Sequence, residues 1–194
     1  RDPEMSRGLG DVYKRQILDI AQNSISAKAS LIEIELCEKN FVLTVRISDN
    51  GKGMSPEQLQ RVRDPFFTTR TTRKVGMGIP LFKMAAEMTG GSFDIESVLG
   101  KGTTVTAVFR TDSIDFTPVG DMAATMCSLI SMNTDIDFLY RRIIGEREFT
   151  LDTRQMREIL GDVPLSSPEV TEFIRDFICE NTREITGGAE NENP

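Results

Sequence analysis

Histidine and tryptophan are absent from the 194 residues, and cysteine occurs only at Cys37, Cys127 and Cys179. The absence of histidine excludes histidine-ligated metal sites, a histidine general base and a phospho-accepting histidine within this sequence. Three widely spaced cysteines, an odd number, fit free thiols in a reducing cytoplasm and argue against a disulfide framework or a zinc site. We therefore expect a cytoplasmic protein.

Long apolar runs and an excess of positive charge are also missing. No stretch approaches the roughly 18 apolar residues of a membrane helix, and the beginning of the chain is too polar for a signal peptide. The net charge of −7 and the pI near 4.8 argue against nucleic-acid or membrane binding. The length suits one domain with an appendage, and 39% of the residues are hydrophobic, which suffices for a core.

The first 16 residues show no clear helical or strand period. The segment DVYKRQ (11–16) is similar to the translation of a sequencing adapter. We therefore set residues 1–16 aside as such a remnant, or as a disordered leader. A remnant would mean that native residues before Ile17 are missing from the sequence.

Residues 17–111 carry the periodicities of an α/β sandwich. Alternating apolar and polar residues predict four strands in two hairpins, at 32–36, 41–47, 93–97 and 105–109. Apolar residues at helical spacing predict helices at 17–28, 56–62 and 79–89. Ser55 and Gln58 form a capping box before the second helix. We expect a mixed sheet covered by helices on one face.

Residues 112–185 predict a small α+β extension. A linker at 112–118 leads to a helical pattern at 120–132, a hairpin around Gly145 and two more helices. The last two helices are expected at 153–160 and 168–181. Glycine, asparagine and glutamate dominate from residue 186 and predict a disordered tail at 186–194.

Asp19 and Asn23 lie one helical turn apart and therefore share a face of the first predicted helix. The amide oxygen of Asn23 is a ligand suited to Mg²⁺, and the Asp19 carboxylate could orient a water or a substrate hydroxyl. A polar stripe on an amphipathic helix is the alternative, and this pair taken alone favours it.

The segment DNGKGM (49–54) follows directly on a predicted strand. Asn50 and Gly51 favour a tight turn because both residue types tolerate positive φ. In the functional interpretation, a buried Asp49 carboxylate accepts the exocyclic N–H of adenine. Gly53 would then let the backbone approach the base.

Residues 61–74 hold five basic side chains against one acid, Asp64, in a chain of net negative charge. They are either a solvated loop or a mobile lid over a triphosphate. Gly76-Met77-Gly78 then opens a helix, where backbone N–H groups can face a phosphate. The segment GKGTT (100–104) predicts a hairpin turn, with Thr103 or Thr104 lining the base pocket.

In this order the motifs resemble those of the GHKL ATPase superfamily, which includes gyrase, a heat-shock chaperone, histidine kinases and mismatch-repair ATPases. Asn23 lies in what resembles the N box. The segments similar to the G1, F, G2 and closing boxes are 49–54, 64–70, 75–78 and 100–104. The resemblance covers residues 17–111 and implies a Bergerat ATP-binding fold that uses ATP and Mg²⁺.

The resemblance also implies a role for each matched position. Mg²⁺ would bind Asn23, adenine would bind Asp49, and the phosphates would lie near Gly76 and Gly78 under the lid. Asp19 stands where related enzymes carry a general base, usually the longer glutamate. The implied nucleotide-binding set is Asp49, Gly51, Gly53, Met54, Thr68, Thr69, Arg70, Gly76, Met77, Gly78, Ile79, Thr103 and Thr104.

Three functions stay open. The chain is a stand-alone regulatory kinase acting in trans on an unidentified partner, an ATP-gated protein-binding switch, or a truncated sensor histidine kinase. The lid and closing box resemble histidine kinases and anti-sigma-factor kinases, and GMG (76–78) is closer to the latter. Residues 112–190 resemble the extension of small stand-alone ATP-binding proteins of anaerobic bacteria. The absence of histidine and of a heptad helix before Ile17 counts against the sensor kinase, and a homodimer stays open.

Overall fold

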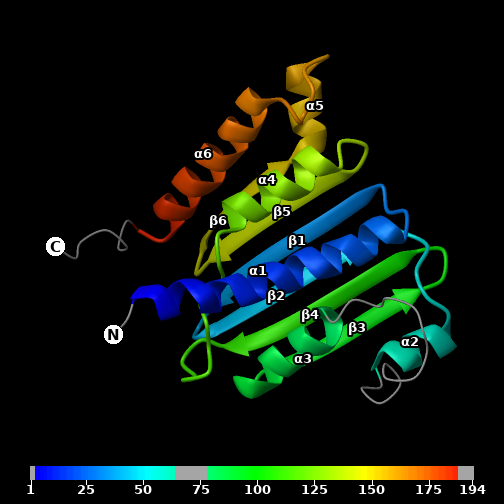
Figure 1. The fold of residues 1–194 in the computed structure, drawn as a ribbon, viewed down its shortest axis with the longest axis vertical. Coiled ribbons are helices and arrows are strands. Elements are labelled where there is room, and N and C mark those ends of the chain that lie inside the picture. Colours follow the sequence, from blue (N-terminus) through cyan, green and yellow to red (C-terminus); the bar gives the residue numbers. More distant parts are fainter. Residues whose placement is uncertain (1–2, 64–77, 188–194) are drawn as a thin grey trace.

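Six strands form one sheet in the order β3-β4-β2-β1-β5-β6 (Figure 1). The computed structural model describes the backbone of residues 3–63 and 78–187, with side chains from Tyr13 onward. The strands are β1 Leu31–Lys39, β2 Val42–Asp49, β3 Ser92–Val98, β4 Gly102–Arg110, β5 Asp137–Ile144 and β6 Arg147–Asp152. Only β1 and β5 pair in parallel; the other four pairs are antiparallel, so the sheet is mixed as predicted.

Helices cover one face of this sheet (Figure 1). The helices are α1 Pro3–Ser26, α2 Pro56–Arg63, α3 Gly78–Met88, α4 Met122–Met132, α5 Thr153–Leu160 and α6 Pro168–Ile185. Of these, α1, α3, α4 and α6 lie over the face, while α2 and α5 lie near the ends of the strands (Figure 1). In β1, Ile32, Ile34 and Leu36 are buried while the intervening Glu33 and Glu35 are less so, which is the period-two pattern of a half-covered sheet. Within the described residues, every helix is too short or too polar to cross a lipid bilayer.

Helix α1 begins at Pro3, well before the predicted start at Ile17. Tyr13 is buried and packs edge-on against Phe109, with ring centroids 5.0 Å apart. Gln16 is also buried and interrupts the apolar stripe, which concealed the helical period in the sequence. Setting residues 1–16 outside the fold was therefore wrong for Tyr13–Gln16, which are part of the core helix.

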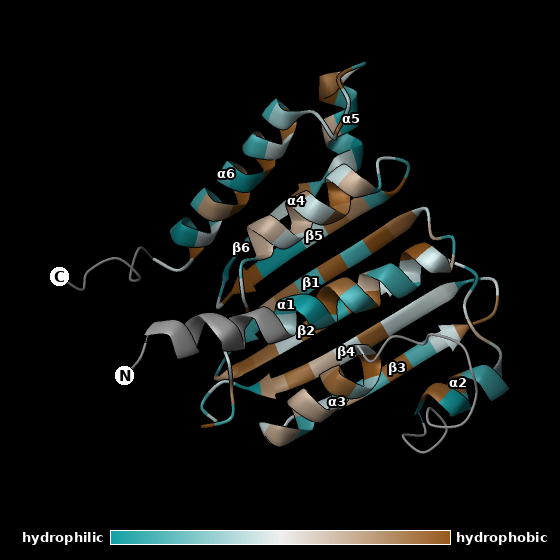
Figure 2. Ribbon diagram, in the orientation of Figure 1, coloured by the Kyte–Doolittle hydropathy of each residue, from teal (hydrophilic) through white to brown (hydrophobic). Residues whose placement is uncertain are grey.

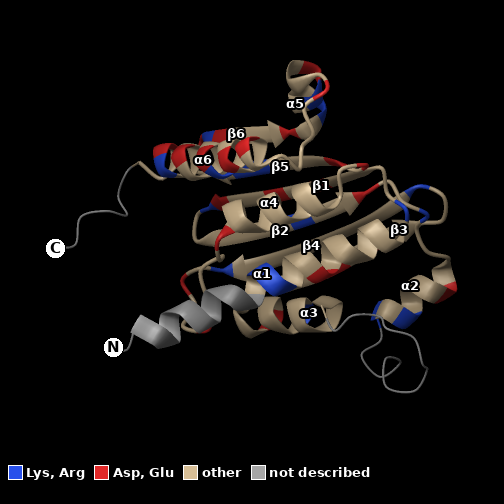
Figure 3. Cartoon of the chain, turned by 45° about the horizontal axis from the view of Figure 1, so that its top comes forward, with Lys and Arg blue, Asp and Glu red and all other residues tan. Residues whose placement is uncertain are grey.

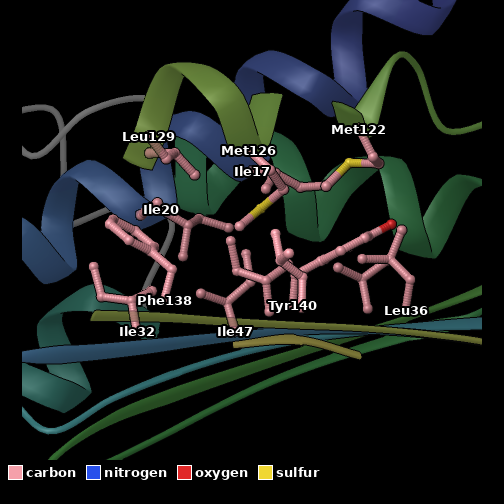
Figure 4. Packing of buried hydrophobic residues seen from close by; sticks show 14 of the residues in the cluster. Ile17, Ile20, Ile32, Leu36, Ile47, Met122, Met126, Leu129, Phe138 and Tyr140 are labelled. Atoms are coloured by element: carbon pink, nitrogen blue, oxygen red, sulfur yellow. The ribbon is translucent and has the colours of Figure 1, made fainter. Parts of the chain in front are cut away.

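The segment after residue 112 completes the same sheet. Strand β5 pairs with β1 from Leu31 opposite Asp137 to Glu38 opposite Ile144. Figure 4 shows side chains from both parts of the chain packed together. They are Ile17 and Ile20 of α1, Ile32 and Leu36 of β1, Ile47 of β2, Met122, Met126 and Leu129 of α4, and Phe138 and Tyr140 of β5. The predicted extension is present, but its core is continuous with that of residues 17–111.

Helix α4 is largely buried, whereas α6 is amphipathic and buries one face. Helix α4 has no charged side chain and lies between α1 and α6, where most of its residues are buried (Figures 1 and 3). Helix α6 alternates hydrophilic and hydrophobic residues (Figure 2), and Val170, Ile174 and Ile178 face the core. Its predicted start is confirmed, because Ser167 caps the helix by accepting a hydrogen bond from the Val170 N–H at 3.4 Å.

Candidate nucleotide site

A cavity of about 300 Å³ lies between the last turns of α1, the neighbouring strands β2, β3 and β4, and the start of α3. This is at the lower end of the range of known small-molecule sites. Its polar lining comes from Asn23, Ser24, Ser26, Asp49, Lys52 and Thr103. Its apolar lining includes Ile20, Ile47, Met54, Val62, Ile79, Ile95 and Val105. The structure therefore gathers most of the described site residues predicted from the sequence around one hollow.

The Asp49 carboxylate is held by two hydrogen bonds. Its Oδ2 accepts from the Ser24 hydroxyl at 2.6 Å, and its Oδ1 accepts from the Gly51 N–H at 2.8 Å. Each carboxylate oxygen has a further lone pair, so the group can still accept a hydrogen bond from a ligand. Ser24 was not predicted, although its place on the sheet-facing stripe of α1 is the signal that could have found it.

Asn50 fixes the loop that follows β2. Its Oδ1 accepts from the backbone N–H groups of Ser30 and Leu31, both at 2.9 Å, and its Nδ2 donates to the Ser30 hydroxyl at 2.8 Å. The Lys52 N–H donates to the Ala27 carbonyl at 2.9 Å. The loop is thereby tied to the connection between α1 and β1, and Asp49 keeps its position.

The positive φ predicted for the Asn50-Gly51 turn was wrong, whereas the approach of the base to Gly53 stays a prediction. Neither Asn50 nor Gly51 has a positive φ. A Cβ on Gly51 would lie 2.8 Å from the Ala27 carbonyl oxygen, and one on Gly53 would lie 2.0 Å from the Val98 carbonyl oxygen. Gly53 also has φ +63°. Both residues allow close packing of backbone on backbone.

Thr103 and Thr104 point to opposite faces of the sheet, as neighbours in a strand must. Thr103 lines the cavity and shares a hydrogen bond of 2.8 Å with the Ser97 hydroxyl, which also accepts from the Met54 N–H at 2.9 Å. Thr104 shares a hydrogen bond of 3.1 Å with Ser48 on the other face. Only Thr103 of this pair reaches the cavity.

Asp19 and Asn23 differ in their relation to the cavity. Asn23 lines it, whereas Asp19 is exposed and is not among the lining residues. Asp19 lies beside Gly78, the first residue of α3, where a Cβ on the glycine would come within 2.5 Å of the Asp19 Cβ. The close approach of α1 and α3 therefore places a carboxylate next to the N-terminal end of α3, the end that favours anions.

Several predicted residues lie outside the described part of the chain. These are Thr68, Thr69, Arg70, Gly76 and Met77. Among the basic residues predicted for the lid, Arg63 lies at the end of α2. Its guanidinium donates to the Ile95 carbonyl and to Asp94. Arg63 thus attaches α2 to β3.

A Mg²⁺ ion would find few protein ligands here. Among the described residues, no group of three or more His, Cys, Asp or Glu could hold a metal ion. Asn23 offers one amide oxygen at the cavity. That donor set suits Mg²⁺, which keeps waters and binds substrate phosphates instead of entering an all-protein cage.

Part of the chain is similar to known proteins. Residues 11–113, just over half of the chain, match the family described as histidine kinase-, DNA gyrase B- and HSP90-like ATPase. A putative sensor protein of Shewanella frigidimarina is 33% identical over 94 residues, which cover 48% of this chain and 14% of that protein. Sensor protein SrrB of Staphylococcus aureus is 51% identical over 63 residues, which cover 30% of this chain and 11% of that protein.

The chain thus spans 14% or less of the length of these two relatives. A solved structure, the N-terminal domain of a DNA repair protein, aligns with 71% of this chain and 51% of its own at 17% identity and a TM-score of 0.47. The motifs and the family match agree on the family of the chain. The chain belongs to the histidine kinase-, DNA gyrase B- and HSP90-like ATPases, and it carries the ATP-binding domain of that family.

Proposed function

We propose that the cavity binds Mg-ATP with the adenine against Asp49, and that the chain is a stand-alone regulatory kinase acting on a partner protein in trans. The observation that carries the proposal is the Asp49 carboxylate, which two hydrogen bonds hold at the wall of a largely apolar cavity. A fixed acceptor in such surroundings selects a ligand that brings an N–H donor, because any other ligand leaves a buried polar group unpaired.

The phosphates would extend from Asp49 toward Asn23 and the start of α3. Asn23 lines the cavity, and Ile79 in the first turn of α3 lines it too. The amide groups of a first helical turn favour phosphate. Asn23 would hold Mg²⁺, and a bound Mg²⁺ would neutralise part of the negative charge of the phosphates. Asp19, beside Gly78, would orient the hydroxyl or imidazole that receives the phosphoryl group.

The phospho-acceptor would lie on a partner. The sequence contains no histidine, so a histidine acceptor would have to lie outside these 194 residues. The family description includes histidine kinases, and the relatives are named sensor proteins; both support phosphoryl transfer to a protein. The same names also fit the alternative that the chain is part of a sensor histidine kinase.

An ATP-gated protein-binding switch is the second candidate, and the position of Asp19 favours it. The side chain is exposed, does not line the cavity, and is one methylene shorter than glutamate. A general base must lie within hydrogen-bonding reach of the proton that it removes. A carboxylate too far from the acceptor would leave ATP binding intact and phosphoryl transfer slow.

Calorimetry with the Asp49→Asn variant tests the adenine assignment. We expect ATP affinity to fall by roughly ten- to hundredfold, since hydrogen bonds to charged groups contribute about 1.5–3 kcal/mol. Asp112→Asn is the matched control, because Asp112 pairs with Arg110 on the surface. Equal affinity of the Asp49→Asn variant and the unmodified chain would refute the assignment.

Titrating ATP with and without Mg²⁺ tests the metal ligand. We expect Asn23→Ala to abolish the dependence of ATP affinity on Mg²⁺, because its amide oxygen is the proposed protein ligand. A dependence that persists in the variant would exclude Asn23 from this role.

Incubation with γ-labelled Mg-ATP, with and without cell extract, separates kinase from switch. Label that appears on a partner and is lost in Asp19→Asn supports the kinase. Tight binding with neither transfer nor hydrolysis supports the switch and overturns the kinase proposal.

A further inference from the structure

A second cavity, of about 370 Å³, lies between the start of α4, strand β5 and helix α6. It shares no lining residue with the nucleotide cavity. Its polar lining includes Asp121, Tyr140, Arg142, Thr182 and Arg183. Leu36, Val119, Met122 and Ile178 give it apolar walls. This cavity therefore combines a hydrophobic enclosure with several polar side chains.

Tyr140 presents an unpaired hydroxyl to this cavity. The residue is 1% exposed, and its hydroxyl makes no hydrogen bond with any described residue. In Figure 4 the oxygen points away from the centre of the core, toward the end where Met122 and Leu36 lie. Burial raises the pKa of Tyr140 to about 12, so the hydroxyl keeps its proton and acts as a donor at neutral pH.

Arg142 adds a positive charge at the wall of this cavity. Its side chain is 12% exposed, and Nη2 donates to the Glu38 carboxylate at 2.9 Å. Its Nη1 is buried without a hydrogen-bond partner among the described residues. A buried donor left unsatisfied costs about 1–3 kcal/mol, and more when it is charged. Because Nη1 is closed to solvent and Nη2 is paired, Arg142 contributes positive charge at the cavity wall, not an open hydrogen-bond donor.

The start of α4 adds donors at the same end of the cavity. The Asp121 carboxylate caps the helix by accepting from the Ala124 N–H at 2.9 Å. Met122 and Ala123, which line the cavity, therefore keep first-turn N–H groups with no partner in the helix. Arg183 of α6 lines the opposite side. The first-turn N–H groups and the Arg183 guanidinium donate hydrogen bonds, so they fit a ligand that accepts them.

We propose that this cavity binds a small organic carboxylate, whose oxygens accept from the Tyr140 hydroxyl beside the positive charge of Arg142 and whose apolar part lies against Leu36 and Ile178. A monoanion fits better than a phosphate dianion, because the Asp121 and Glu38 carboxylates offset part of the positive charge of the two arginines. The apolar walls favour an organic body over a free inorganic ion. This site is independent of the ATP site proposed above.

Isothermal titration of the full chain with sodium hexanoate tests the site. We expect saturable binding, with hexanamide and inorganic phosphate at least roughly tenfold weaker because neither offers a monoanionic head on an apolar body. Tyr140→Phe removes one hydroxyl and is expected to weaken hexanoate binding by roughly tenfold. Arg142→Gln is expected to weaken it further.

Arg141→Gln is the matched control, because Arg141 is next in the strand and pairs with Glu35 and Glu148 on the other face of the sheet. Its affinity for hexanoate is expected to equal that of the unmodified chain. Thermal melting checks that each variant folds. If Arg142→Gln does not fold, the hexanoate affinity of Tyr140→Phe tests the site. Absent saturation, unchanged affinity in Tyr140→Phe, or tighter binding of phosphate than of hexanoate would each overturn the proposal.

Discussion

Gly53 lies where the loop after β2 packs against the hairpin of β3 and β4. Its φ of +63° is in the left-handed region, and a Cβ would meet the Val98 carbonyl oxygen at 2.0 Å. Because the obstacle is backbone, no side-chain rotation can relieve the contact. The position therefore joins two constraints, one on the torsion angle and one on space.

We expect Gly53→Ala to destabilise the fold by about 3 kcal/mol or more. About 1–2 kcal/mol comes from the left-handed conformation, and overpacking adds about 1–3 kcal/mol. Gly90→Ala is the control, because Gly90 has φ +78° but nothing within 4 Å of a Cβ, so only the first cost applies. Urea unfolding measures both, and equal losses would show that the Val98 contact is unimportant.

Asp152 stabilises the start of α5. Its carboxylate accepts from the Arg154 backbone N–H and from the Arg154 guanidinium. The hydrogen bond from the Arg154 side chain is the chief cause that holds the pKa of Asp152 below its ordinary value, while burial acts in the opposite direction. The ionised carboxylate therefore contributes fully above the ordinary pKa of about 3.9, and the contribution is lost as pH falls through the lower folded-state value.

The Asp152→Asn variant is expected to be less stable than the unmodified chain at pH 7, by less than about 1 kcal/mol because Arg154 is half-exposed. The difference should shrink below a pH of about 4. Urea unfolding at pH 7 and pH 3 measures it. Asp135→Asn, at an exposed residue without an ion pair among the described residues, serves as control. A difference that grows in acid would contradict the assignment.

Some residues of the nucleotide cavity can be predicted from short motifs in the sequence, and others cannot. Asn23, Asp49 and Thr103 could be found from motifs in the chain, and all three line the cavity. Ser24 and Ser97 lie outside these motifs: the sheet-facing stripe of α1 is the one signal for Ser24, and Ser97 acts through a partner 43 residues away. Of Thr103 and Thr104, the alternation along β4 indicates Thr103, because it shares a face with the buried Val105 and Ala107.

Helix α4 connects the two parts of the fold. Met126, fully buried in the middle of the helix, packs in the cluster shared with α1, β1 and β5 (Figure 4). Met132, at the end of the same helix, is 81% exposed. Two methionines of one helix thus offer a matched comparison of buried and exposed positions.

Met126→Ala is expected to lower the free energy of unfolding by about 2–5 kcal/mol, through lost burial and the cavity left behind. Met132→Ala is expected to change it by no more than about 0.5 kcal/mol. Both are measured by urea unfolding with probes in either half of the chain. A loss confined to the C-terminal half would show that the two halves unfold separately.

Helix and strand bounds were largely predictable because periodicity and caps are local. The capping box is confirmed, with the Ser55 N–H donating to Gln58 and the Gln58 N–H donating to Ser55. The order of the strands was not predictable in this way. The pairing of β1 with β5 depends on residues more than a hundred positions apart, and no local pattern specifies it.

The described residues on both sides of residue 112 share one hydrophobic core. Removing residues 112–194 would leave β1 as a sheet edge and uncover the side chains of α1 and β1 that Phe138, Tyr140 and Met126 cover (Figure 4). An edge strand with an uncovered apolar face favours aggregation.

We therefore expect residues 1–111 alone to lack cooperative unfolding and to give a poorly dispersed amide NMR spectrum. The full chain, prepared in parallel, is the reference for both measurements. A well-dispersed spectrum together with ATP affinity equal to that of the full chain would show that the ATPase segment folds independently.

The parallel pairing of β1 with β5 also bears on how the protein is made. Synthesis proceeds from the N-terminus, so β1 emerges from the ribosome long before its outer neighbour has been translated. Until then one edge of β1 has no neighbouring strand, and chaperones and proteases can reach it. We therefore expect the ATPase segment to mature only after β5 has been translated.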